Sequence, residues 1–265
     1  MATTKFTNEI VLTSVNDRVG TVTLNRPEVR NALSSELLAV LPQALSSLDE
    51  DPEVDVLVLT GADPAFCAGL DLRELGGSAG NINPDRPSKA KGPFPSYTKP
   101  LIGAINGVAV TGGLELALAC DFLIASDRAA FADTHARVGV MPGWGLSVLL
   151  PQAIGVRRAR EMSLTGNYID AQTAAAWGLV NRVVPHELLL ETVQSLASDI
   201  SSNDQEGVQQ MLKTYERTGD TTVAEGWEIE ASMGADWLER SDFKPQKVAQ
   251  RRAEIQTRGR TQNRS

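Results

Sequence analysis

The sequence predicts an α/β fold, because short apolar segments typical of strands recur along the chain and are followed by segments with helical spacing. The apolar run Val54–Thr60, which ends at Gly61, is one such strand. Glycine-rich turns join later strands to helices, and the region after Ser201 is more polar and helical throughout. We therefore expect an α/β core over residues 1–200 and a helical C-terminal subdomain over residues 201–265.

The N-terminal part of the core carries the pattern of a β-hairpin followed by a helix. Strand-type residues in Ile10–Val15 and Val19–Leu24 lie on either side of a polar turn. A helix is expected over Ser34–Leu48, behind two serines that suit an N-cap. Pro42 should kink or restart this helix, because proline lacks the backbone donor and clashes with the preceding turn.

The rest of the core continues the alternation. Further strands are expected at Leu101–Ile105, Val108–Val110 and Phe122–Ala125. Further helices are expected at Leu114–Ala119, Leu146–Ile154, Arg157–Leu164, Ala171–Ala176 and Glu187–Ile200. A Gly/Pro/Ser-rich interval at Gly76–Pro95 is expected to be a mobile loop able to cover a site.

Composition and charge exclude several functional classes. The formal charge of −8 and the pI near 4.9 argue against a surface for nucleic acid or anionic lipid, since such partners select for a basic field. No stretch approaches the about 20 apolar residues of a membrane span, and the first residues lack the apolar core of a secretory signal. A cytoplasmic location without a membrane partner is therefore expected. Cys67 and Cys120 lie in apolar surroundings and are predicted to be buried reduced thiols.

Two glycine-rich turns are candidates for holding an anionic oxygen. Ala68 and Gly69 lead into a helical segment that starts at Asp71, where backbone N–H groups have no internal partner. Gly112 and Gly113 join another strand to a helix. Two separate N–H donors that converge on one oxygen are what a thioester enolate needs. A nucleotide phosphate site is the alternative, but neither turn has the lysine and hydroxyl of a P-loop or matches G-x-G-x-x-G.

Several segments resemble motifs of the enoyl-CoA hydratase/isomerase (crotonase) superfamily, in the family's order and spacing. They are residues 25–33 (NRPEVRNAL), 65–75 (AFCAGLDLREL), 99–107 with 112–121, 164–166 (LTG) and 174–181 (AAAWGLVN). The resemblance implies a crotonase-like spiral of β-β-α units and a helical C-terminal part that trimerises, giving a homotrimer or a hexamer of two trimers. It implies an acyl-CoA thioester as partner, no metal, and no cofactor besides the coenzyme A of the substrate.

The resemblance also assigns site residues. The oxyanion-hole N–H groups fall on Leu70 and Gly112. The substrate-binding positions are Arg30, Ala68, Asp71, Leu72, Arg73, Gly113 and Trp144. Candidate contacts to the coenzyme's phosphates are Arg26, Arg30, Arg73, Lys99 and Lys244. Glu28 stands where many relatives carry a basic residue.

Glu115 is the first candidate catalytic residue, because an unpaired charge inside the apolar run LELALAC is costly to bury. Hydration of a 2-enoyl thioester needs water activated for attack at the β-carbon and a proton delivered to the α-carbon, and related hydratases use two glutamates. The second position falls on His135, which departs from the family pattern. Histidine transfers protons near neutral pH, so Glu115 and His135 are the predicted pair, with Asp133 a spare carboxylate nearby.

These assignments predict a 2-enoyl-CoA hydratase. Trp144 replaces a small residue and would narrow the acyl pocket, unless it is plain core. A Δ3,Δ2-enoyl-CoA isomerase that needs only Glu115 is the second hypothesis. The third is an acyl-CoA-binding protein that kept the oxyanion hole and lost efficient catalysis through His135, whose side chain would then only hydrogen-bond a ligand or be structural.

Overall fold

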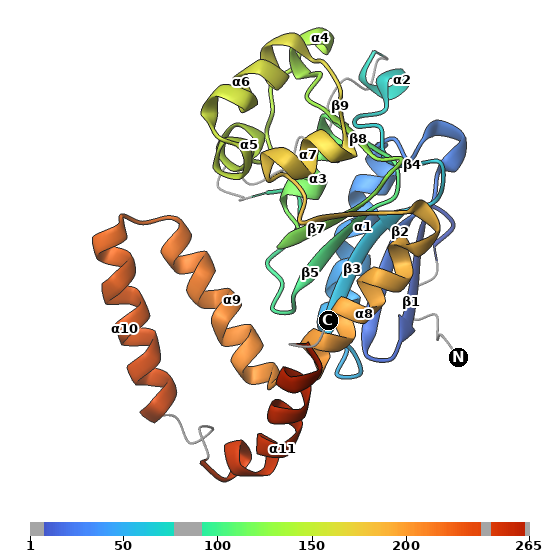
Figure 1. The fold of residues 1–265 in the computed structure, drawn as a ribbon. Coiled ribbons are helices and arrows are strands. Elements are labelled where there is room, and N and C mark those ends of the chain that lie inside the picture. Colours follow the sequence, from blue (N-terminus) through green and yellow to red (C-terminus); the bar gives the residue numbers. More distant parts are fainter. Residues whose placement is uncertain (1–7, 77–91, 240–244, 263–265) are drawn as a thin grey trace. The chain divides into compact units, whose positions relative to one another are not determined.

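The computed structural model describes residues 8–76, 92–239 and 245–262 of the chain (Figure 1). It separates into two compact units, Met1–Gln209 and Gln210–Ser265. Over these described ranges, no helix is both long and apolar enough to span a membrane. Most of the Gly/Pro/Ser-rich interval and Lys244 lie outside the described residues.

The larger sheet of the first unit has the strand order β1-β2-β3-β5-β7-β10. Its strands are β1 (Val11–Asn16), β2 (Val19–Leu24), β3 (Val56–Gly61), β5 (Leu101–Ile105), β7 (Phe122–Ser126) and β10 (Arg182–Val184). β1 and β2 form the predicted antiparallel hairpin, and the other neighbours pair in parallel. Five of these strands were predicted, whereas β10 is too short to show a pattern of its own.

The smaller sheet has the order β4-β6-β8-β9. It consists of β4 (Ala65–Cys67), β6 (Val108–Val110), β8 (Ala130–Ala132) and β9 (Ile169–Asp170). Three times the chain passes from the larger sheet to the smaller one and then into a helix, namely α2 (Leu72–Leu75), α3 (Gly112–Leu118) and α4 (His135–Val138). This repetition is the predicted spiral of β-β-α units.

Helices cover both faces of the larger sheet. Side chains of successive strand residues point to opposite faces, so Leu57 and Leu59 pack in one apolar cluster and Val56 and Val58 in another. The first cluster contains the apolar side of α1 (Ser35–Asp49), and the second that of α8 (Leu189–Ser201). The remaining helices of this unit are η1 (Pro27–Val29), α5 (Leu146–Ile154), α6 (Val156–Thr165), α7 (Ala171–Trp177) and η2 (His186–Leu188).

Helix α1 does not restart at Pro42, which was one of the two predicted outcomes; the other, a kink, stays a prediction. The helix runs without interruption through Pro42, and Ser34 caps it by accepting a hydrogen bond from Leu37 N at 3.2 Å. Five side chains of α1 are buried: Leu37, Leu41, Ala44, Leu45 and Leu48. Burying a leucine contributes about 1.5–3 kcal/mol, so this apolar face outweighs the about 3 kcal/mol that an internal proline costs.

The second unit is helical. Its segments belong to α9 (Gln205–Gly219), which begins in the first unit, α10 (Val223–Glu239) and α11 (Pro245–Gln262). Thr222 and Glu225 form a capping box before α10, with hydrogen bonds of 3.0 and 3.3 Å between each side chain and the other residue's N–H. The helical C-terminal region is therefore as predicted; its role in trimerisation stays a prediction.

Candidate active site

The two glycine-rich turns lie side by side at the ends of neighbouring strands. β4 and β6 pair in parallel, and each leads into one of the turns. A Cβ added to Gly69, whose φ is +89°, would lie 2.7 Å from the carbonyl oxygen of Val110 and 3.6 Å from the nitrogen of Gly112. Such a close approach requires glycine, so the turns meet through their backbones.

The predicted oxyanion donors sit in these turns. Within the described part of the chain, the N–H groups of Leu70 and Gly112 have no backbone hydrogen-bond partner. On either side of Leu70, the carbonyl of Gly69 accepts from Leu33 N at 2.8 Å and the N–H of Asp71 donates to Leu33 O at 3.0 Å. The first bond holds the peptide group that carries the Leu70 N–H, and the second holds the next peptide group along the chain.

Thr111 holds the second turn in a conformation that favours glycine. Its φ of 54° lies in the left-handed region, which costs a non-glycine residue about 1–3 kcal/mol. The hydroxyl oxygens of Thr111 and Thr134 are 2.5 Å apart, and Thr134 N donates to Thr111 Oγ1 at 3.1 Å. The second glycine-rich turn is thereby tied to the residue that precedes His135. Sequence reasoning missed this contact, because a pair of threonines 23 positions apart carries no local pattern.

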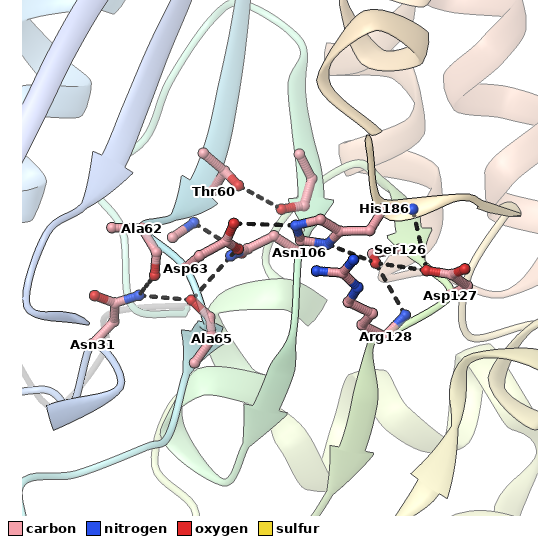
Figure 2. A network of polar contacts seen from close by, with 12 residues as sticks. Asn31, Thr60, Ala62, Asp63, Ala65, Asn106, Ser126, Asp127, Arg128 and His186 are labelled. Atoms are coloured by element: carbon pink, nitrogen blue, oxygen red, sulfur yellow. Dashed lines mark hydrogen bonds and ion pairs between the residues drawn. The ribbon is translucent and has the colours of Figure 1, made fainter. Parts of the chain in front are cut away.

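Two asparagines from the family motifs fix the connection between β3 and β4 (Figure 2). Asn31 Nδ2 donates to the carbonyls of Ala62 and Ala65 at 2.8 and 2.7 Å. Asn106 Nδ2 donates to Asp63 Oδ1 at 2.9 Å and to Ala65 O at 3.2 Å. Both amides thus hold the start of β4, the strand that leads into the first turn.

Arg26 and Asp71 stabilise the turn after β4. Arg26 Nη2 lies 3.1 Å from Asp71 Oδ2, and Arg26 Nη1 donates to Ala32 O at 2.5 Å. Asp71 caps α2 by accepting from Arg73 N at 3.1 Å. Both side chains therefore have structural partners beside the predicted binding region.

Glu115 projects from the first turn of α3 and is buried. Its Oε1 accepts a hydrogen bond from the backbone N–H of Trp144 at 2.7 Å. Its Oε2 lies 3.5 Å from His135 Nε2. The structure brings together the two residues that the sequence predicted as the catalytic pair.

His135 begins α4 and lies between two carboxylates. Its Nδ1 is 2.6 Å from Asp133 Oδ1, which also accepts from His135 N at 3.1 Å. Burial disfavours a charged imidazole, but hydrogen bonds and charge from Asp133 and Glu115 outweigh it and raise the pKa of His135 to about 9. Although burial also acts against the Asp133 carboxylate, hydrogen bonds from His135 and Ser163 lower its pKa. The raised pKa of His135 favours an imidazolium at neutral pH, placed between the Asp133 carboxylate and the Glu115 side chain.

Trp144 is buried beside the second glycine-rich turn. A Cβ added to Gly112 would lie 3.3 Å from Cζ3 of the Trp144 ring and 3.0 Å from Leu33 Cδ1. The indole therefore packs over the Gly112 backbone. The backbone N–H of Trp144 orients Glu115. Trp144 joins the two parts of the predicted site.

Two predicted binding residues have clear packing roles. A Cβ on Gly113 would lie 2.2 Å from Cys67 O, so this glycine lets α3 pack against β4. The N–H of Ala68 donates to Arg30 O at 3.0 Å. Substrate contact by these residues stays a prediction.

Among the predicted phosphate contacts, Lys99 has a different role in the structure. Its buried ammonium donates to Leu48 O at 3.0 Å and to Asp51 O at 2.7 Å, at the C-terminal end of α1. A lysine caps free carbonyls there favourably, so Lys99 is a helix-capping residue. By contrast, Arg30 and Arg73 are exposed beside the first turn.

The cysteines are free and buried, as predicted. Burial raises the pKa of Cys67 to about 12, which keeps the thiol protonated. Across the described ranges, His, Cys, Asp and Glu do not gather in any group of three or more that could hold a metal ion.

A second histidine–aspartate contact lies away from Glu115 (Figure 2). His186 Nε2 is 3.1 Å from Asp63 Oδ2, and His186 Nδ1 is 3.0 Å from Ser126 Oγ. Ser126 is fully buried and its Oγ accepts from Arg128 N at 3.0 Å. The serine is thus inaccessible as a nucleophile, and the network joins the loops after β3, β7 and β10.

Comparison with known proteins identifies the class to which this fold and site belong. The model of the family Enoyl-CoA hydratase/isomerase matches residues 14–257, and the chain belongs to that family.

Individual relatives and solved structures also resemble this chain. The chain is 40% identical over 187 residues to the probable peroxisomal enoyl-CoA hydratase 1 of Arabidopsis thaliana, covering 71% of each chain. It is 36% identical over 256 residues to a probable enoyl-CoA hydratase of Rhizobium meliloti, covering 94% of this chain and 99% of the relative. The crystal structure of an enoyl-CoA hydratase from Mycobacterium tuberculosis shares 50% identity at a TM-score of 0.74, covering 85% of this chain and 98% of that one. The family predicted from the motifs is confirmed.

Proposed function

We propose that the protein is an enoyl-CoA hydratase that adds water across the double bond of a 2-enoyl-CoA. Family membership supports the reaction class. The observation that carries the proposal is the buried contact between Glu115 and His135, 3.5 Å apart and beside the two glycine-rich turns. It supplies two proton-transfer groups, the number that hydration requires.

The Leu70 and Gly112 N–H groups are the proposed donors to the thioester oxygen. Attack at the β-carbon moves negative charge onto this oxygen, and each donor aimed at it lowers the barrier by about 3–4 kcal/mol. Within the described residues neither N–H has a backbone partner, and the two turns are in contact; both observations support this assignment.

Glu115 is the proposed base for the attacking water. Its Oε1 is held by Trp144 N–H, so the carboxylate has a fixed orientation before substrate binds. His135 is the proposed acid at the α-carbon. The exposed side chains of Arg30, Leu72 and Arg73 are proposed to bind the coenzyme portion.

Turnover of enoyl-CoA substrates by the wild type and two variants tests this function. Loss of the conjugated enoyl-thioester absorbance should be seen with 2-enoyl-CoAs of several chain lengths, and Glu115→Gln should lower kcat by about 10²–10⁴-fold. Glu161→Gln is the matched control, because Glu161 is exposed on α6. Absence of turnover by the wild type with every substrate would refute the proposal, and product analysis from a 3-enoyl-CoA separates hydration from isomerisation.

We further propose a homotrimer, alone or paired into a hexamer, located in the cytoplasm. Large apolar side chains on α9 and α10, including Met211, Tyr215 and Trp227, are exposed within the second unit, which supports burial against other copies. Analytical ultracentrifugation measures the assembly, and a monomer would refute it. Localisation of the tagged chain tests the compartment.

A further inference from the structure

Asp133 is buried at the end of β8 and makes two contacts with His135 through a single oxygen. Its Oδ1 is 2.6 Å from the ring Nδ1 and accepts the backbone N–H at 3.1 Å. These contacts fix the position of the ring and leave Nε2 as its remaining nitrogen. Nε2 lies 3.5 Å from Glu115 Oε2.

The charges of this arrangement require a cation in the middle. Asp133, His135 and Glu115 are 2%, 4% and 3% exposed, so water screens them little. Two buried carboxylates without a positive partner are strongly unfavourable, whereas an imidazolium between them donates one N–H to each. The geometry therefore favours the doubly protonated ring.

We propose that Asp133 is a positioning residue that keeps His135 as an imidazolium with its transferable proton on Nε2, so that His135 enters the reaction as the proton donor. This inference rests on the proposed hydratase function and assigns a definite starting charge to each group. Asp133 acts only through His135 and touches no reacting atom.

Among the described residues, no further charged group shifts the pKa of the His135 ring. Asp133 and Glu115 are the charged groups that raise the pKa of His135. Helix α6, which packs against α4, supplies the Ser163 side chain as a hydrogen-bond partner of Asp133. The charged side chains of α6 and α4 are exposed, namely Arg157, Arg158, Arg160, Glu161 and Arg137.

With these starting charges, each proton that one group releases in the reaction is taken up by another. The water oxygen bonds to the β-carbon while its proton passes to Glu115, and the electron pair of the double bond moves onto the thioester oxygen as an enolate. Collapse of the enolate takes the His135 Nε2 proton to the α-carbon and restores the thioester carbonyl. The proton on Glu115 then returns to Nε2 across the 3.5 Å contact. One water is added, and both side chains regain their starting states.

The pH dependence of kcat tests the role of Asp133. In the wild type, activity should fall at alkaline pH as His135 loses its proton near about pH 9. Asp133→Asn keeps an oxygen for the Nδ1–H but removes its charge, so the alkaline limb should move down by about 1–2 pH units, with KM changed little. Asp63→Asn is the matched control, because it makes the same change at the His186 contact.

Nuclear magnetic resonance of ¹⁵N-histidine provides a readout that does not depend on the variant folding. The chain has two histidines, and His186→Gln assigns the second signal. In the wild type at neutral pH, both ring nitrogens of His135 should show imidazolium shifts.

The outcomes separate this inference from the proposed function. Lack of turnover by the wild type refutes the hydratase proposal and removes the reaction on which the inference rests. Turnover with an alkaline limb that stays in place in Asp133→Asn overturns the inference alone, as does a neutral His135 ring in the wild type. An alkaline limb that moves down in Asp133→Asn, together with a charged His135 ring in the wild type, supports the inference.

Discussion

Replacing His135 with glutamine should destabilise the fold in a pH-dependent way. The substitution removes the cation between Asp133 and Glu115 and leaves two buried carboxylates without a positive partner. The pKa of His135 is raised from 6.5 to about 9, and each unit corresponds to about 1.4 kcal/mol, so the charged ring contributes at most about 3 kcal/mol. This agrees with the about 3–5 kcal/mol measured for breaking buried ion pairs.

The sign of the pH dependence follows from the raised pKa. A folded-state pKa above the unfolded value gives stability that is fully present below about pH 6.5 and is lost as the pH rises through about 9. The wild type should therefore exceed His135→Gln by about 3 kcal/mol near pH 6, and by less than about 1 kcal/mol near pH 10.

Urea denaturation of both proteins at fixed protein concentration measures this difference. His186→Gln is the control, because its partner Asp63 has a side chain that is 62% exposed and screened by water. A difference between wild type and His135→Gln that stays constant from near neutral to alkaline pH would refute the ion-pair reasoning.

Three further predictions concern residues around the site. Trp144→Ala should widen the acyl pocket and raise kcat/KM for bulkier 2-enoyl-CoAs relative to short ones; an unchanged preference across a substrate panel would show that the indole is only core. Lys99→Met should lower the free energy of unfolding by about 1.5–3 kcal/mol, because the C-terminal carbonyls of α1 lose a charged donor, and a raised KM for acyl-CoA would instead restore its binding role. Gly113→Ala should cost about 1–3 kcal/mol or more in thermal unfolding, because the added Cβ would lie 2.2 Å from Cys67 O; a neutral effect would mean that α3 shifts freely.

Local sequence patterns predicted most of the fold. Strand-type residues on both sides of a turn predicted the hairpin, and apolar runs predicted the strands β3, β5 and β7. Helical spacing predicted the helices α5 to α8. The motifs predicted the family, which the match over residues 14–257 confirms. They also identified Glu115 and His135, which the structure places 3.5 Å apart.

Prediction from local patterns failed for the shortest strands and for the effect of Pro42 on its helix. Strands β4, β8, β9 and β10 have two or three residues, fewer than a period needs, and form because neighbouring strands supply their hydrogen bonds. The restart at Pro42 did not occur, because five buried side chains of α1 compensate for one missing donor.

The sequence by itself determined the family, the pattern of strands and helices, and which residue types stand at the predicted catalytic positions, because these depend on neighbours along the chain. Only the tertiary structure decided what each charged group faces. Lys99 turned out to cap α1, and Asp133 proved to be a partner of His135. The charge state of His135 depends on carboxylates from two elements that fold together, and hence on distances that no spacing in the sequence records.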